Sequence, residues 1–254
     1  MKNRSIVKRF FAIAAAVAMT LALCACSSGT VSSSDGPTVT AGGSAEPSQP
    51  AGDKTYKVAI IKLMDHASLD EIAEAVGSEL EKLAKDNGVT IQYEITSGQN
   101  DQSTLKQLAD QAIADGADVI VPIATTAAKV AALSAEDTKT PVVFAAVSYP
   151  DDESVALTGI DYVTGTSDAL NTRAIIDLML LQNPDLSKVG LLYSLSEDNS
   201  ARPVAEAKEY LDSKGIAYTE QTGNSNDEVI AAASALIAEG VDAVFTPTDN
   251  VIQS

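Results

Sequence analysis

The sequence is poor in the residues that bind transition metals or act as nucleophile–base pairs. Among 254 residues there is no tryptophan, one histidine, His66, and two cysteines, Cys24 and Cys26. Zinc and iron sites are built from clusters of cysteine and histidine, and structural disulfides need cysteines in the folded body, so neither is expected. A Ser-His or Cys-His nucleophile would have to rely on His66 alone. We therefore expect no metal centre and no thiol chemistry.

Positive charge and phosphate-binding loops are also scarce. Lysine and arginine number 17 against 35 aspartate and glutamate, a net charge of -18, and no basic run occurs after residue 9. So acidic a chain repels phosphate backbones, which excludes a nucleic-acid partner. No G-x-G-x-x-G follows Leu63 or Tyr193, and no G-x-x-x-x-G-K-[ST] occurs anywhere. We therefore expect no nucleotide and no other cofactor.

The first 25 residues have the pattern of an export signal. Four basic residues precede an uncharged run at 10–23, which is shorter than the ~20 apolar residues of a comfortable membrane span but suits a secretory signal. Leu23, Ala25 and Cys26 resemble the bacterial lipobox, in which the cysteine is lipidated and becomes the mature N-terminus. We predict a lipoprotein signal at 1–25 and lipidation of Cys26. An uncleaved anchor and an ordinary secretory signal are the alternatives.

Residues 26–54 are dominated by Ser, Thr, Gly, Ala and Pro. Such a stretch lacks the apolar side chains that would offset the entropy of ordering it, so we expect a flexible tether. With a lipid before it, the tether predicts a folded body held just outside a membrane.

From residue 57 onward, short β-branched apolar runs alternate with amphipathic segments. We predict strands at 57–63, 89–96, 118–124 and 141–147, and helices at 68–86, 102–114 and 126–133. The first helix carries an S-x-x-E capping box from Ser68 to Glu71 and stops at Asn87-Gly88. Continuous apolar strands separated by helices indicate an α/β fold with a parallel sheet covered on both faces.

A second series follows, with helices at 168–181, 201–213 and 227–238 and strands at 188–193, 217–221 and 241–245. The segment 240–247 is similar to 116–122, which favours two α/β lobes of one construction, at 55–165 and 166–254, with a cleft between them. Residues 251–253 resemble the first turn of a further helix that stops without a cap. We therefore expect the second lobe to be incomplete and the chain to be a fragment.

Ligands of open parallel sheets bind outside the carboxyl ends of the strands. Thr125 and Thr126 begin a helix there, where free N–H groups favour a carboxylate, although a threonine can simply cap the helix. Glu197 and Asp249 would accept an ammonium group or lie on the solvated surface. The polar residues of these strand ends also include His66, as a ligand donor or a satisfied loop histidine, and Asn199, as a ligand contact or a helix cap.

Six segments occur in an order that resembles a known family. They are DHASLD (65–70), IATTAA (123–128), PVVFAAV (141–147), TGTSD (164–168), VGLLY (189–193) with EDNS (197–200), and PTDN (247–250). From about Tyr56 to its end, the chain resembles the ABC-transporter substrate-binding lipoproteins of the aromatic amino-acid (tryptophan) type. These have the type I periplasmic-binding-protein fold.

The resemblance implies two Rossmann-like lobes that close on a small solute and present it to a membrane permease. Thr125 and Thr126 would receive an amino-acid carboxylate, and the acids of the second lobe its ammonium group. The residues implied to line the cleft are His66, Thr125, Thr126, Ser148, Asp168, Glu197, Asn199, Asp249 and Asn250. The family often has an acid where this chain has Tyr149, and a tyrosine there could stack on an aromatic ligand.

The expected function is binding, without catalysis. We expect a lipid-anchored receptor on the extracytoplasmic side of the membrane, at a Gram-positive cell surface. It would bind an amino acid, which the resemblance implies is aromatic, and deliver it to an ABC permease and its ATPase. One alternative is a sensing co-receptor that passes the solute signal to a signalling partner, and another is a sugar or nucleoside ligand. A hydrolase or isomerase in the same cleft is disfavoured by the single histidine and the missing phosphate loop.

Overall fold

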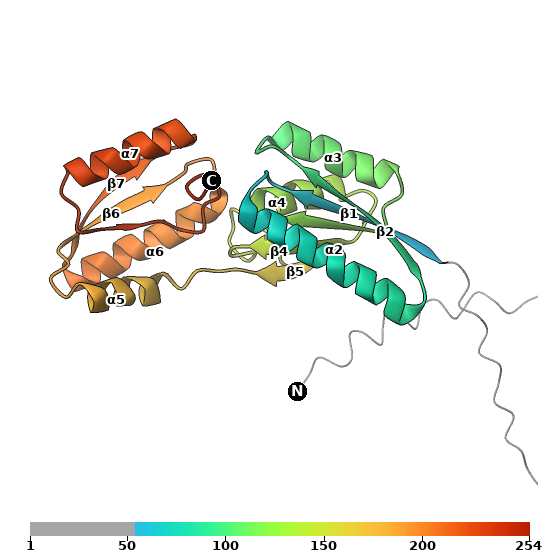
Figure 1. The fold of residues 1–254 in the computed structure, drawn as a ribbon, viewed down its shortest axis with the longest axis horizontal. Coiled ribbons are helices and arrows are strands. Elements are labelled where there is room, and N and C mark those ends of the chain that lie inside the picture. The colour runs from blue at the N-terminus through green and yellow to red at the C-terminus, as the bar shows by residue number, and fades with distance from the viewer. Residues whose placement is uncertain (1–53) are drawn as a thin grey trace, which may run out of the picture. The chain divides into compact units, whose positions relative to one another are not determined.

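The structure is a computed structural model that describes residues 54–254 (Figure 1). The predicted signal at 1–25, the lipidated Cys26 and all but the last residue of the tether at 26–54 lie outside the described residues. Those three assignments stay predictions.

The first five strands form a parallel sheet in the order β2-β1-β3-β4-β5. β1 pairs in parallel with both β2 and β3, and β4 pairs with β3 and β5. The strand bounds are β1 Thr55–Lys62, β2 Thr90–Ser97, β3 Val119–Ile123, β4 Val142–Val147 and β5 Val163–Ser167. The predicted α/β class is confirmed. This sheet and its helices, residues 55–167, are called the first lobe below.

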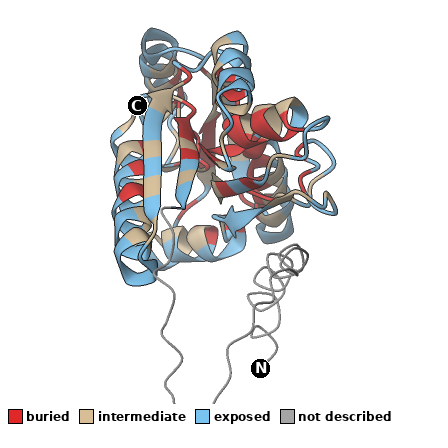
Figure 2. Ribbon diagram, turned by 90° about the vertical axis from the view of Figure 1, so that its right-hand side faces the viewer, coloured by how far each residue is buried: buried red, intermediate tan, exposed pale blue. Residues whose placement is uncertain are grey.

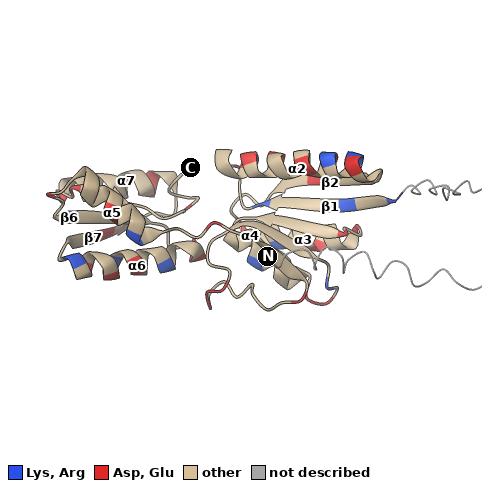
Figure 3. Ribbon diagram, turned by 90° about the horizontal axis from the view of Figure 1, so that it is seen from below, with Lys and Arg blue, Asp and Glu red and all other residues tan. Residues whose placement is uncertain are grey.

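Three helices cover this sheet on both faces: α2 Ala67–Asn87, α3 Gln102–Ala114 and α4 Thr125–Ser134. Figure 3 shows α2 on one face and α3 with α4 on the other, with charged residues distributed along α2. Ile60, Ile120 and Val142 of the three inner strands are fully buried, and Figure 2 shows buried segments on inner strands and on parts of the helices. The apolar strands read as unbroken runs because both of their faces are covered.

The remaining strands form a second parallel sheet in the order β7-β6-β8. Helices α5 and α6 share a core with Phe245 of β8 on one face, while α7 packs on Leu192 of β6 on the other. The bounds are α5 Thr172–Gln182, β6 Lys188–Tyr193, α6 Asp198–Lys214, β7 Ala217–Thr222, α7 Asn226–Ala238 and β8 Ala243–Phe245. These elements and the turn that follows them, residues 172–254, are called the second lobe.

Helix α2 begins differently from the prediction but ends as predicted. Its N-cap is His66, whose Nδ1 accepts the backbone N–H of Ser68 at 3.2 Å. The predicted capping box at Ser68 is therefore wrong, because the imidazole nitrogen already satisfies that first-turn donor. At the other end Gly88 has φ 62° and closes the helix, a left-handed conformation that glycine adopts without steric cost.

Strand β5 was not predicted, since four of its five residues are exposed and it carries no apolar run. Its place beside β4 requires Gly165, because a Cβ there would lie 2.2 Å from the carbonyl oxygen of Phe144. Helix α5 starts four residues later than predicted, where Asn171 Oδ1 accepts the N–H of Ala174 at 3.1 Å. The segment 168–171 thus crosses from one lobe to the other.

Candidate functional site: a cavity between the lobes

A cavity of about 190 Å³ lies at the carboxyl ends of the strands and is lined by residues of both lobes. Its apolar wall consists of Leu69 and Ile72 of α2 with Ala124 and Ala146, and no aromatic side chain lines it. Five of the nine predicted site residues line it: Thr125, Ser148, Asp168, Asn199 and Asn250. The volume corresponds to about six water molecules.

The wall from the first lobe is the N-terminus of α4. The N-cap residue is Ala124, whose side chain cannot accept a hydrogen bond. The hydroxyl of Thr125 accepts the N–H of Ser148 at 3.3 Å and so joins the ends of β3 and β4. Thr125 therefore does not cap the helix, and the first-turn N–H groups present the positive end of the helix dipole.

The backbone is strained on this wall. Ala124 has φ 82° and ψ 159°, a region that is essentially reserved for glycine. Ala146 and Tyr149, which flank Ser148 at the end of β4, also have positive φ angles of 52° and 51°. Non-glycine residues in such conformations persist only where the surrounding structure holds them, and they cluster at ligand sites.

Replacing Ala124 with glycine should relieve this strain. Ala128, fully buried inside α4, provides the control. Ala128→Gly removes a similar buried methyl group and raises the conformational entropy of the unfolded chain by a similar amount. We expect Ala124→Gly to be about 1–3 kcal/mol more stable than Ala128→Gly, which is the usual cost of such a conformation. Urea unfolding of the two variants measures the difference, and equal stabilities would mean that Ala124 carries no strain.

Asp249 is fully buried in the second lobe but does not line the cavity. Its Oδ2 accepts the N–H of Ser194 and the hydroxyl of Ser200, both at 2.7 Å. Its Oδ1 accepts the N–H groups of Val251 and Ile252, both at 3.1 Å. Asp249 thus ties the end of β6, the start of α6 and the last turn of the lobe together.

Glu197 is the second buried acid, with 4% of its surface exposed. Its two oxygens accept hydrogen bonds from Nδ2 of Asn250 at 3.3 and 3.0 Å. Burial, together with the nearby charge of Asp249, raises the pKa of Glu197 to about 7. Neither acid is a solvated surface residue, which removes that alternative of the sequence analysis.

Asn199 lies in the first turn of α6, which begins at Asp198 rather than at Ala201. Its Nδ2 donates to the backbone oxygen of Thr248 at 2.6 Å. The side chain is 5% exposed, and Oδ1 has no hydrogen-bond partner among the described residues. Asn199 is therefore not the helix cap that was one of its two predicted roles.

His66 and Thr126 lie beside this cavity without lining it. His66 donates from Nε2 to the backbone oxygen of Gln253, a cavity residue, at 2.8 Å, since its Nδ1 is already an acceptor. Thr126 lines a neighbouring cavity of about 290 Å³ that also reaches Ser196 of the second lobe.

Further contacts join the lobes around the cavity. The hydroxyls of Ser148 and Thr248 are 3.2 Å apart, and Lys129 of α4 forms an ion pair with Asp198 of α6. Arg202 lies 4.4 Å from the ring centroid of Tyr149. The Tyr149 ring thus stacks on Arg202 and does not line the cavity, so it does not provide the ligand stacking that the sequence suggested.

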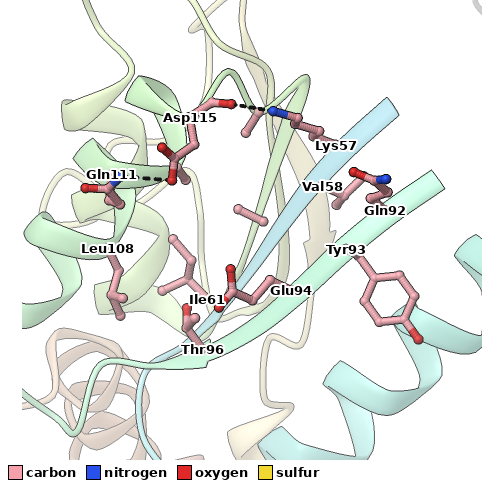
Figure 4. Close-up of a pocket in the computed structure, with 13 residues that line it drawn as sticks. Lys57, Val58, Ile61, Gln92, Tyr93, Glu94, Thr96, Leu108, Gln111 and Asp115 are labelled. Carbon is pink, nitrogen blue, oxygen red and sulfur yellow. Dashed lines mark hydrogen bonds between the residues drawn. The ribbon is translucent and has the colours of Figure 1, made fainter. Parts of the chain in front are cut away.

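Another hollow, of about 380 Å³, lies between β1, β2 and α3 of the first lobe (Figure 4). Val58 and Leu108 form part of its apolar floor, and Lys57 donates from Nζ to the backbone oxygen of Asp115 at 2.8 Å on its rim. None of the predicted site residues lines it. We assign the candidate site to the cavity between the lobes.

Two kinds of feature are absent from residues 54–254. No group of three or more His, Cys, Asp or Glu side chains is placed to hold a metal ion in this part of the chain. No helix formed by these residues is both long enough and apolar enough to cross a membrane.

Comparison with known proteins relates the chain to solute-binding proteins. The family model described as "ABC transporter substrate binding protein" matches residues 57–254. A tyrosine-binding protein of Clostridioides difficile is 29% identical over 205 residues, which cover 79% of this chain. The chain spans 58% of the length of that relative.

Solved structures agree with this relation. An ABC domain from Streptococcus pneumoniae in complex with L-Trp is 32% identical, with a TM-score of 0.68, and the match covers 79% of this chain and 68% of that one. A conserved domain protein from Vibrio cholerae is 27% identical, with the same TM-score and coverage.

Proposed function

The chain belongs to the ABC transporter substrate binding protein family, and from this membership we propose that it captures an amino acid between its lobes for import. The ligand would occupy the cavity at the strand ends, and delivery would be to a membrane permease driven by its ATPase. The proposal extends to the predicted location, with a lipid on Cys26 holding the protein on the extracytoplasmic side of a Gram-positive membrane.

The opposite polarity of the two cavity walls carries the proposal. The first lobe contributes the uncapped N-terminus of α4, which favours a carboxylate at Thr125 and Thr126. The second lobe has two buried acids behind its wall, Asp249 and the partly ionised Glu197, and their negative potential favours an ammonium group. An amino-acid zwitterion carries one group of each sign, so it matches the two walls.

The aromatic class of ligand is supported by the relatives. One is named for binding tyrosine and another holds L-Trp. These names describe ligands rather than reactions, so we propose a binding protein without catalytic activity. Leu69 and Ile72 provide an apolar surface against which a large side chain could pack.

A thermal-shift screen of amino acids, sugars and nucleosides tests this function. A ligand at a hundred times its Kd stabilises the protein by about 2.7 kcal/mol, which raises the Tm by several degrees. We expect the largest shift with tryptophan or tyrosine. A shift with a sugar or nucleoside and none with any amino acid would overturn the proposed ligand.

A further inference from the structure

The first turns of α6 contact the first lobe through two charged side chains. Asp198 and Arg202 stand four residues apart on this helix and therefore lie on the same face of it. Asp198 forms an ion pair with Lys129 of α4. Arg202 lies over the ring of Tyr149, 4.4 Å from its centroid, and 3.6 Å from a carboxylate oxygen of Asp151. The helix thus presents one negative and one positive group, and each meets a complementary group of the first lobe.

Tyr149 connects this contact to the segment that joins the lobes. The residue is 6% exposed, and its hydroxyl donates to the backbone oxygen of Leu170 at 2.9 Å. Leu170 belongs to the segment 168–171, where the described part of the chain passes from one lobe to the other (Figure 1). Tyr149 therefore contacts the crossing segment and α6 at once, and moving the lobes apart must break its contact with Arg202.

These side chains lie outside the cavity assigned to the ligand. Lys129, Asp198, Arg202 and Tyr149 do not line it. Lys129 and Asp198 line a separate groove of about 520 Å³. They can therefore affect a ligand only through the position of one lobe against the other. A solute held between two lobes enters when the lobes part, so contacts made only in the closed arrangement favour the bound state.

The position of the ion pair gives it more effect than its exposure suggests. The side chains of Lys129 and Asp198 are 32% and 43% exposed, and such pairs usually contribute little to folding because water and salt screen them. A pair between lobes, however, is lost whenever the lobes part. Its whole energy therefore enters the equilibrium between closed and open molecules, and the observed Kd rises as the closed fraction falls.

We propose that Asp198 and Arg202, with Lys129 and Tyr149 opposite them, are positioning residues that hold the lobes together over the ligand and so set its affinity without contacting it. This inference rests on the proposed function for the identity of its ligand, whereas the contacts between the lobes belong to the protein itself. It gives Tyr149 a role in lobe closure in place of stacking on the ligand.

Exchanging the charges of the ion pair tests the inference. Lys129→Asp and Asp198→Lys each bring two like charges together between the lobes. We expect each to lower the affinity for L-tryptophan about tenfold in calorimetric titration of the 254-residue chain, about 1.4 kcal/mol. The double variant restores opposite charges and should return the affinity to within about threefold of the unaltered chain, whereas two independent structural defects would add. Arg202→Gln should lower the affinity about threefold.

Lys106 and Asp110 provide the matched control. They form an ion pair of 2.6 Å within α3, and their side chains are 59% and 49% exposed. Lys106→Asp and Asp110→Lys change the net charge by the same amounts as the substitutions between the lobes, but both groups belong to one lobe. We expect each to leave the affinity for tryptophan within twofold. A tenfold loss here as well would overturn the inference, because net charge alone would then explain the effect.

The separation of the lobes can be measured without any ligand. Residues 54–254 contain no cysteine, so two labels can be attached at introduced cysteines once Cys24 and Cys26 are replaced with serine. Spin labels at Gln107→Cys of α3 and Ala231→Cys of α7, both exposed positions, report the distance between the lobes by pulsed electron paramagnetic resonance. We expect each single charge reversal to shift this distance to longer values and the double variant to reverse the shift.

The outcomes separate the two proposals. A double variant whose label distances stay at those of the single variants would overturn the role of the ion pair. Failure of the unaltered chain to bind tryptophan and tyrosine would overturn the proposed ligand instead, and the label distances would still decide what holds the lobes together. Melting temperatures of all variants, compared with the unaltered chain, show whether a loss of binding comes from unfolding.

Discussion

Replacing Asp249 with alanine is expected to destabilise the protein by about 4 kcal/mol. The carboxylate accepts hydrogen bonds from Ser194, Ser200, Val251 and Ile252 in a fully buried position. Alanine would leave these donors without an acceptor and would separate the end of β6 from α6. The free energy of unfolding in urea measures the loss.

Asp242 provides a matched control for this substitution. Its Oδ2 also accepts several hydrogen bonds, from the N–H and hydroxyl of Ser187 and the N–H of Lys188, but the residue is exposed. Water can replace it there, so Asp242→Ala should cost about 1 kcal/mol. If both variants lost the same small amount, the burial of Asp249 would not contribute to stability.

Glu197 should make the stability of the ligand-free protein depend on pH. Its pKa is about 7 in the folded protein, against 4.5 for an unperturbed glutamate. The folded state therefore binds more protons than the unfolded state between those values, and raising the pH favours unfolding. Relative to Glu197→Gln, we expect the free energy of unfolding to fall by about 3 kcal/mol as the pH rises from 4.5 to 7.

Urea unfolding at intervals between pH 4 and 8 checks this linkage. The difference between the unaltered chain and Glu197→Gln should change most between about pH 4.5 and pH 7 and level off within about one pH unit outside that interval. Glu74→Gln, on the exposed surface of α2, should give a curve parallel to that of the unaltered chain. A constant difference between the unaltered chain and Glu197→Gln across the whole range would contradict the raised pKa.

Most of the fold could be predicted because its strands are buried on both faces. The helix at 102–114 was predicted with the bounds of α3, and the apolar runs located β1, β3, β4 and β6 within two residues at each end. β5 could not be found in this way, because its residues are mostly exposed and its position depends on the backbone approach at Gly165.

The site was predictable in its location but less so in its contacts. The rule that ligands bind at strand ends led to Thr125, Ser148 and Asn199, which do line the cavity. Asp168, which also lines it, was predicted only from the resemblance to a family. The environment of Asp249 depends on Ser194 and Ser200, which lie 55 and 49 residues earlier in the chain. No local pattern shows such partners, so an internal acid and a ligand contact look the same in the sequence.

Each of the two sheets is formed by one continuous stretch of the chain, and this affects the order in which they can fold during synthesis. Every strand pair of the first sheet joins residues between Thr55 and Ser167, and every pair of the second joins residues between Lys188 and Phe245. Chains are made from the N-terminus, and domains generally fold as units in that order. Thr248 and Gln253 of the cavity follow both sheets, so the cavity is the last part of the described fold to form.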